Sequence, residues 1–216
     1  SKGFSALLTD AVANYHTLDT GYCLPLYYFE ENKNKQRSLF DEESNDDYIR
    51  RDGITDWILK EVRTRYGAKN ITKEMIFYYV YGLLHSKEYR ERFADDLKKS
   101  LPRIPIVDRV EDFMDFYQYG KKPADLHLNY EKVVPCPGVY VEHPFDVEAT
   151  EDGVPIPESD DYLKYRVDKM RFAKGKGGEK YDKSVIIYNE SITVKNIPTK
   201  AYEYIVNGKS AIEWIM

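Results

Sequence analysis

The feature that most limits the possible folds is a series of apolar residues at helical spacing between residues 54 and 117. Apolar side chains that recur every three or four positions form the buried face of a helix. The spacing predicts four successive helices and a helical subdomain over residues 54–130. The expected buried faces are Ile54, Trp57, Ile58, Val62 and Tyr66; Ile76, Phe77, Val80, Tyr81 and Leu84; Tyr89, Phe93 and Leu97; and Val110, Phe113, Met114 and Tyr117.

Residues that begin or interrupt helices indicate where these helices end. The third helix must stop before Leu101-Pro102-Arg103-Ile104-Pro105, because proline disfavours helical structure in the residue before it. Pro123 suits the first position of a short extra helix that reaches Tyr130. The other expected boundaries are Gly67 as the end of the first helix, Thr72 and Ser86 as N-caps of the second and third, Asp108 with Glu111 as an acidic capping box of the fourth, and Gly120 as its end.

Both ends of the chain are rich in strand-forming residues, which predicts an α+β fold with the helical subdomain at its centre and strands from both ends flanking it. Near the N-terminus, Tyr22–Phe29 reads as a strand, with Pro25 at an edge or bulge, and Glu30–Asp47 reads as an exposed loop. A connection rich in Pro and acidic residues covers 131–161, and a basic, β-rich part with terminal helices covers 162–216. Its expected elements are a strand over Tyr162–Ala173, a hairpin of Ser184–Asn189 and Ser191–Ile197 that turns at Asn189-Glu190, a short helix from Pro198 to Val206, and a turn at Asn207-Gly208 into a last helical run.

Charge is distributed unevenly along the chain. The formal net charge is −5, which alone argues against a general nucleic-acid binder, because phosphate neutralisation needs Lys and Arg. Residues 162–186 nevertheless hold eight basic and three acidic side chains, a local charge of +5 that leaves −10 for the remainder. The glycines of Lys174-Gly175-Lys176-Gly177-Gly178 make part of this stretch a flexible basic loop. Distribution matters more than the sum for nucleic-acid binding, so this stretch can either follow phosphates or form a solvated strand face.

The sequence shows no arrangement of residues typical of catalysis or metal binding. Gly208-Lys209-Ser210 resembles the end of a phosphate-binding loop, but Glu203 stands where that loop requires glycine. None of the four histidines has a partner at metal-ligand spacing, and Cys23 and Cys136 are isolated. We therefore expect no enzyme activity, cofactor or metal in this chain. We also expect a cytoplasmic location without a membrane span. The absence of an initial Met and the apolar last residues suggest a piece of a longer polypeptide.

A set of segments spread over nearly the whole chain is distinctive in its order. The segments are Ile54–Trp57, Phe77–His85, Tyr89–Phe93, Leu101–Pro105, Leu126–Glu131, Lys169–Phe172, Tyr188-Asn189 and Tyr202–Ser210. Together they resemble the C-terminal specificity region of Type ISP restriction-modification enzymes. The resemblance implies a parent polypeptide with a nuclease, a helicase-like ATPase and an N6-adenine methyltransferase upstream, which would use magnesium, ATP and S-adenosylmethionine. It also implies that this chain recognises double-stranded DNA and contacts the methyltransferase domain.

The residues expected to contact DNA come mainly from the basic stretch. Lys and Arg position a duplex through its phosphates, and an Arg fork or an Asn amide can read base edges. The candidates are Arg103, Lys169, Arg171, Lys174, Lys176 and Asn189. Two other classes of function stay open: a docking scaffold between methyltransferase and motor, marked by exposed aromatic side chains, and a hydrolase or nuclease whose catalytic residues meet only in the fold.

Overall fold

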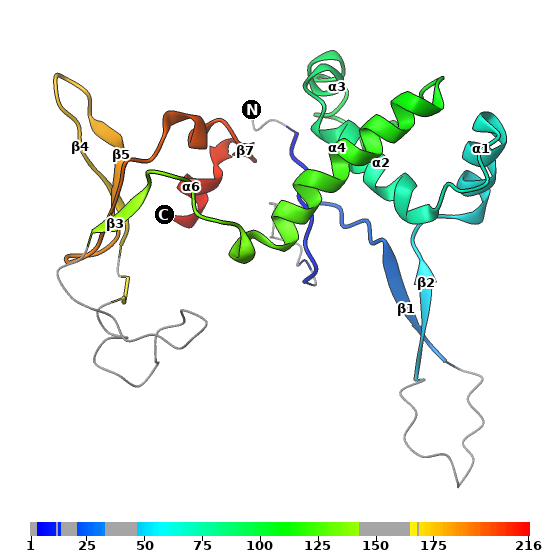
Figure 1. Ribbon diagram of the computed structural model, residues 1–216, viewed down its shortest axis with the longest axis horizontal. Helices are drawn as coiled ribbons and strands as arrows, with labels where there is room; N and C mark the ends of the chain where they lie inside the picture. The colour runs from blue at the N-terminus through cyan, green and yellow to red at the C-terminus, as the bar shows by residue number, and fades with distance from the viewer. Residues whose placement is uncertain (1–3, 12, 14–20, 33–46, 143–164, 168) are drawn as a thin grey trace, which may run out of the picture. The chain divides into compact units, whose positions relative to one another are not determined.

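The structure is a computed structural model that describes residues 4–11, 13, 21–32, 47–142, 165–167 and 169–216. The described residues form two compact units, one within Gly3–Lys132 and the other within Val133–Met216. The first unit contains strands β1 (Tyr27–Glu31) and β2 (Tyr48–Asp52), then helices α1 (Asp56–Tyr66), α2 (Lys73–His85), α3 (Lys87–Arg92) and α4 (Val110–Leu128), and a 3-10 turn, η1 (Tyr130–Lys132) (Figure 1). The prediction of an α+β fold with four central helices and flanking strands is confirmed.

Three of the predicted helix boundaries are confirmed, two by hydrogen bonds and one by its backbone conformation. The side chains of Thr72 and Ser86 accept bonds from the first turns of α2 and α3, and Gly67 ends α1 in the left-handed conformation (φ 62°). Strand β2, which pairs antiparallel with β1, was not predicted. Most of the loop expected over Glu30–Asp47 lies outside the described residues.

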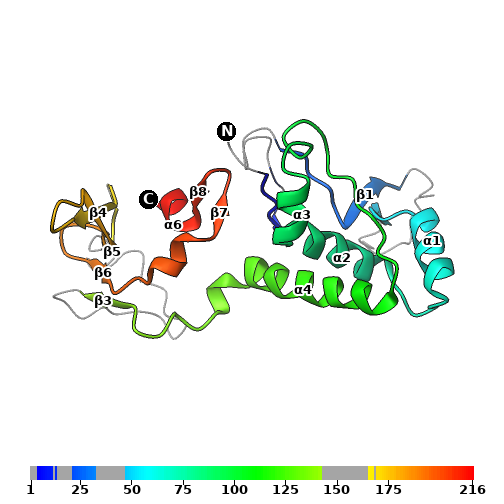
Figure 2. The same cartoon turned by 90° about the horizontal axis from the view of Figure 1, so that it is seen from above.

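The prediction of a break in the fourth helix is wrong, because α4 runs through both Gly120 and Pro123. Phe113, Gly120 and Ala124 are buried along its length, and α2 and α4 pack side by side (Figure 2). This packing offsets the cost of the proline, which removes one backbone donor and crowds the carbonyl of the preceding turn. The expected capping box is also wrong: Arg109 is the N-cap without a side-chain bond, while the Asp108 carboxylate binds Arg65 at 2.5 Å.

The core of the helical unit is formed by residues from all three long helices. Val62, Ile76, Tyr79 and Phe113 are almost completely buried, and the Tyr79 and Phe113 rings stack with centroids 4.6 Å apart. The predicted faces are right in part. Trp57 was expected to be buried but is 69% exposed, whereas the buried Tyr79 and Leu83 were not predicted. Helix α3 is shorter than its apolar spacing indicates, and Leu97 reaches a second buried cluster from the turns that follow.

Tyrosine hydroxyl groups hold the segment between α3 and α4 in place. Tyr89 donates to the carbonyl of Arg103 (2.8 Å), and Tyr79 donates to that of Pro105 (2.6 Å). Tyr66 donates to the carbonyl of Val107 (2.6 Å). Buried hydroxyl groups need such partners, and these bonds fix the proline-containing segment against the helices.

The second unit is built on a four-stranded antiparallel sheet in the order β3-β6-β5-β4. Its strands are β3 (Tyr140–Glu142), β4 (Arg171–Lys174), β5 (Tyr181–Ile187) and β6 (Thr193–Lys195). A 3-10 turn, η2 (Thr199–Tyr202), leads to a small hairpin of β7 (Ile205–Val206) and β8 (Lys209–Ser210), and then to α6 (Ala211–Ile215). The predicted hairpin around Asn189-Glu190 is confirmed as β5 and β6.

Three predictions for this unit need correction or fall partly outside the description. The strand expected over Tyr162–Ala173 begins only at Arg171, and part of that range lies outside the described residues. The helix expected from Pro198 to Val206 is only the short η2. Asn207 and Gly208 have positive φ angles (47° and 82°) and connect two strands, as in tight hairpin turns. Strand β3, inside the predicted connection, was missed because it is three residues long.

Candidate nucleic-acid interface

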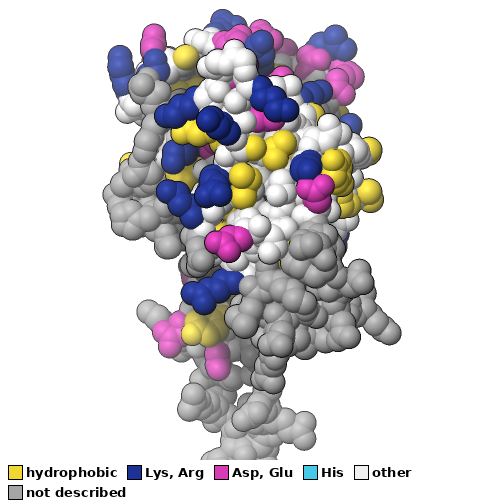
Figure 3. Space-filling view, turned by 90° about the vertical axis from the view of Figure 1, so that its left-hand side faces the viewer, with side chains coloured by type: hydrophobic (Ala, Val, Ile, Leu, Met, Phe, Trp, Pro, Cys, Tyr) yellow, Lys and Arg dark blue, Asp and Glu magenta, His cyan; other side chains and the backbone are white. Residues whose placement is uncertain are grey.

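The later part of the basic stretch, from Arg171 onward, forms the β4–β5 hairpin at one edge of the four-stranded sheet. Arg171 lies opposite Ile187 and Lys174 opposite Tyr181, and the strand register shifts between Phe172 and Ala173. Figure 3 shows Lys and Arg side chains gathered on the end of the molecule that carries β4 and β5. The hairpin is therefore an exposed basic element on an ordered sheet.

The hairpin tip requires glycine for two different reasons. A Cβ at Gly175 would lie 2.3 Å from the Glu179 carbonyl oxygen, so this position permits a close approach of the two backbones. Gly177 and Gly178 instead have positive φ angles (64° and 96°) with open space around them. Glycine adopts this conformation without steric cost. Lys176 therefore lies, exposed, on a tight turn at the tip.

Four of the predicted contact residues are exposed cations that form no salt bridge within the described residues, although Lys176 acts at longer range on Asp182, whose carboxyl pKa is lowered first by hydrogen bonds from Ser184 and then by this lysine. Lys169, Arg171, Lys174 and Lys176 form no ion pair with a carboxylate in the part of the chain that the structure describes. Lys183, on the same hairpin, is different: its Nζ lies 3.1 Å from Glu213 and 5.1 Å from the centre of the Tyr202 ring. The four unpaired cations are available to a polyanion, whereas Lys183 links the hairpin to α6.

The electrostatic environment of Glu213 explains why Lys183 is held. The backbone N–H and side chain of Ser210, followed by Lys183, lower the pKa of the Glu213 carboxyl to about 2. The glutamate stays ionised above that pH and keeps its bond to the lysine. This makes Lys183 a structural cation and a natural control for the others.

Asn189 forms hydrogen bonds within the protein rather than projecting freely. Its Oδ1 accepts from the backbone N–H groups of Ser191 and Ile192 (2.9 and 2.7 Å), and its Nδ2 donates to the carbonyl of Arg166 (3.2 Å). The neighbouring Tyr188 hydroxyl donates to the carbonyl of Tyr165 (3.0 Å). These bonds shape the β5–β6 turn and anchor the segment that leads through Lys169 into β4.

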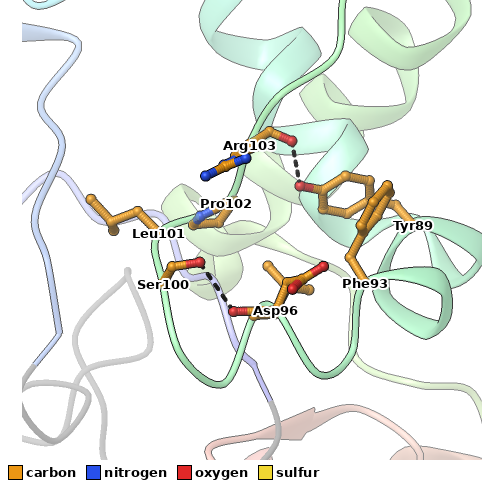
Figure 4. A pocket seen from close by; sticks show the side chains of 8 residues that line it. Tyr89, Phe93, Asp96, Ser100, Leu101, Pro102 and Arg103 are labelled. Atoms are coloured by element: carbon orange, nitrogen blue, oxygen red, sulfur yellow. Dashed lines mark hydrogen bonds between the residues drawn. The ribbon is translucent and has the colours of Figure 1, made fainter.

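Arg103 lines a pocket of about 240 Å³ in the helical unit, with Tyr89 and Phe93 on one side and Pro102 and Arg103 on the other (Figure 4). Its carbonyl is held by Tyr89, while its exposed side chain has no ion pair among the described residues. The structure thus gathers Lys169, Arg171, Lys174, Lys176 and Asn189 in one unit and leaves Arg103 in the other.

Two further residues of the hairpin belong to this surface and were not singled out from the sequence. Tyr181 is 49% exposed opposite Lys174, and the Lys180 amine lies 5.1 Å from the centre of its ring. A cation above an aromatic ring is attracted by the ring's negative face. Their place could have been found only from the register of β4 and β5, because the sequence pattern shows no more than a basic segment.

Among the described residues, no group of three His, Cys, Asp or Glu side chains is placed to hold a metal ion. No helix in the described part of the chain is both long enough and apolar enough to cross a membrane. The exposed basic hairpin on the four-stranded sheet is therefore the candidate binding surface.

Comparison with known proteins identifies the family. The Type ISP C-terminal specificity domain matches residues 1–216, so the chain belongs to that family. The family resemblance expected from the sequence is confirmed. A search of the curated proteins found no match.

Solved structures of Type ISP enzymes are similar to the chain. The ATP-dependent Type ISP restriction-modification enzyme LlaBIII bound to DNA is 37% identical with a TM-score of 0.72; the similarity covers 99% of this chain and 12% of that one. A nuclease-deletion mutant of the Type ISP enzyme LlaGI with a DNA substrate mimic is 46% identical over 68% of this chain and 12% of its own, with a TM-score of 0.52. A DrdV–DNA complex is 27% identical over 100% of this chain and 18% of its own, with a TM-score of 0.71. This chain therefore spans about an eighth of the first two relatives.

Proposed function

We propose that this domain selects a double-stranded DNA target site for a Type ISP restriction-modification enzyme. The observation that carries the proposal is the β4–β5 hairpin with the segment that enters it, where Lys169, Arg171, Lys174 and Lys176 are exposed and form no salt bridge within the described residues. Membership of a specificity-domain family supports it, as do similar solved structures described as DNA complexes. Phosphate contacts are formed mainly by Lys and Arg, and such cations are what a duplex requires.

The proposed mechanism separates positioning from reading. Lys169, Lys174 and Lys176 contact phosphates and fix the register of the domain on the duplex. Arg171, on the strand, reads a base edge, and a good bidentate pair of this kind contributes about 1–3 kcal/mol of discrimination against other bases. Asn189 orients the hairpin through its bonds to the turn and to the Arg166 carbonyl. Arg103 adds a contact from the helical unit.

The chemistry that follows target selection belongs to the rest of the parent enzyme. We propose that this domain contributes no catalytic group and that its parent carries nuclease, helicase-like ATPase and adenine methyltransferase activities. Magnesium, ATP and S-adenosylmethionine would be bound by those parts, and the methyltransferase of the same chain would be this domain's protein partner.

A docking scaffold is the second candidate function, favoured by one face of the β1–β2 ribbon. Phe29 lies opposite Arg50, and Tyr48 lies opposite Glu31 on the same face. Phe29 and Tyr48 are both 65% exposed, and the Arg50 guanidinium lies 4.4 Å from the centre of the Tyr27 ring. Exposed aromatic and Arg side chains are typical of protein interfaces.

Binding to random-sequence duplexes over a salt series separates the two functions. The logarithm of the association constant should fall linearly with the logarithm of the salt concentration, with a slope of about 0.9 for each phosphate contacted. Lys174→Ala with Lys176→Ala should lower that slope by about 2, whereas the double control Lys121→Ala with Lys122→Ala, on exposed positions of α4, should leave it unchanged. No binding near 50 mM salt, a condition that strengthens phosphate contacts, would contradict the proposal and favour the scaffold.

A further inference from the structure

The strand register places Arg171 in a row of side chains that crosses the whole four-stranded sheet. Arg171 lies opposite Ile187, Ile187 opposite Thr193, and Thr193 opposite Glu142. Directly opposite residues of antiparallel strands project from the same face. The row therefore aligns Arg171 and Thr193 on one face, two strands apart, which is about 10 Å at the usual strand spacing.

The other face of the sheet is turned toward the unit's own core. Phe172, Ile186 and Val194 are neighbours in the adjacent row. Ile186 is buried, and the Phe172 ring lies 5.9 Å from that of Tyr202 in η2. Since successive side chains alternate between faces, the row with Arg171 and Thr193 faces away from this packing.

The two ends of the row differ in their electrostatic state. At the β3 end, the Glu142 carboxylate is neutralised by Lys195 at 2.5 Å. At the β4 end, Arg171 has no ion pair within the described residues. Between them, the half-buried Thr193 hydroxyl has no hydrogen-bond partner in the part of the chain that the structure describes. The row thus offers a guanidinium donor and a hydroxyl that can donate or accept.

We propose that Thr193 is a second base-reading residue, which acts with Arg171 on the outer face of the sheet while the lysines of the hairpin tip contact only phosphates. The inference depends on the proposed function. Threonine can bond base edges and place its methyl group against that of thymine, and Arg matches guanine in bidentate fashion. Their separation of about 10 Å corresponds to about three base-pair steps of 3.4 Å.

Rigidity supports this division of roles. Discrimination between bases needs side chains held within fractions of an ångström, and strands position them more precisely than loops do. Arg171 lies on β4 and Thr193 on β6, and both strands pair with β5. Thr193 is the first residue of β6 and follows the turn that Asn189 fixes. Lys176 lies instead on a turn with two glycines at positive φ. Phosphate contacts carry no direct sequence information and tolerate that freedom.

The test is selection of bound duplexes from a random-sequence pool by the full-length protein and three variants. Thr193→Val removes the hydroxyl but keeps the size and strand preference, Arg171→Lys keeps the charge without the fork, and Lys176→Ala removes a tip contact. Thr199→Val, at an exposed threonine of η2, is the matched control. Thermal unfolding of each variant establishes that it is folded.

Thr193→Val and Arg171→Lys should each relax the selected motif at a different position, by about 5- to 150-fold in base preference, without changing the salt dependence. Lys176→Ala should keep the motif and weaken all sequences alike. If Thr193→Val kept the motif while Arg171→Lys relaxed it, the role of Thr193 would be overturned and that of Arg171 would stand. No motif with the unaltered protein would overturn the proposed function and this inference with it.

Discussion

Gly82 of α2 and Gly120 of α4 lie face to face where the two helices pack. A Cβ built on Gly82 would lie 2.1 Å from the Phe116 carbonyl oxygen, and one built on Gly120 would lie 2.0 Å from that of Tyr78. Both neighbours are backbone atoms, which cannot turn aside as a flexible side chain can. The contact explains why α4 continues through a glycine that the sequence pattern suggests as its end.

Gly82→Ala should therefore destabilise the helical unit by about 3 kcal/mol, because the helices must separate to admit a methyl group. Denaturant unfolding followed by circular dichroism measures this. Gly67→Ala is the control: its methyl group would meet nothing within 4 Å, and only the left-handed backbone (φ 62°) is strained, at a cost of about 1 kcal/mol. Equal losses in the two variants would show that the close helix contact is absent.

Tyr79 predicts a loss of stability at alkaline pH. Burial raises the pKa of its hydroxyl to about 12, whereas an unfolded tyrosine ionises near 10. The neutral hydroxyl therefore makes its full contribution to the free energy of unfolding below pH 10. This contribution is lost as the pH rises to 12, at about 1.4 kcal/mol per pH unit. Unfolding free energies between pH 8 and 11.5 measure this slope.

Tyr79→Phe should remove that part of the alkaline slope. At pH 8 it should also cost about 1–3 kcal/mol, because the Pro105 carbonyl and the Val107 N–H lose their partner. Tyr119→Phe, at a position 52% exposed, serves as the control. Identical slopes for Tyr79→Phe and the unaltered protein would contradict the assignment.

His85 and His127 predict a second loss of stability at acidic pH. Burial lowers the pKa of both rings, and each lies near the other, with centroids 6.1 Å apart. As the pH falls, the unfolded chain therefore takes up protons before the folded chain does. The free energy of unfolding is greatest above pH 6.5 and decreases as the pH drops through the folded-state pKa. Nδ1 of His127 is 2.5 Å from the Tyr81 hydroxyl. His127→Gln keeps a polar partner there and should show a smaller loss between pH 7.5 and 5. The same loss in both proteins would be evidence against this account.

The cap of α6 predicts a local effect in the C-terminal unit. Ser210 is buried, its side chain accepts from the Glu213 N–H, and Glu213 binds the Ser210 N–H in return. Ser210→Ala should cost about 1 kcal/mol and accelerate amide hydrogen exchange in residues 211–216, while Ser210→Thr should restore most of the protection. Unchanged exchange in Ser210→Ala would refute a contribution of the cap to local stability.

Local signals made part of the fold predictable. The N-caps at Thr72 and Ser86, the end of α1 at Gly67 and the β5–β6 hairpin each depend on residues within a few positions of one another. The continuity of α4 depends instead on Gly82, 38 positions before Gly120. Strands β2 and β3 are short, and their pairing with β1 and β6 is decided by residues far away in the sequence.

The candidate site shows the same limit. The basic, glycine-rich composition of residues 174–178 was enough to predict a basic loop there, but not that this loop is the tip of the β4–β5 hairpin. The role of Asn189 was not predictable, because its bond to the Arg166 carbonyl joins residues 23 positions apart. Thr193 carries no signal in the sequence at all, and only the strand register aligns it with Arg171.

The most direct test of target selection is the sequence content of duplexes that the unaltered full-length protein retains from a random pool, at a salt concentration where non-specific binding is weak. The proposed function predicts one short motif, enriched reproducibly and bound more tightly than its scrambled form. Mismatches in that motif should each cost about 1–3 kcal/mol. Salt-sensitive binding without any enriched motif would contradict the claim and leave the hairpin as a non-specific DNA clamp.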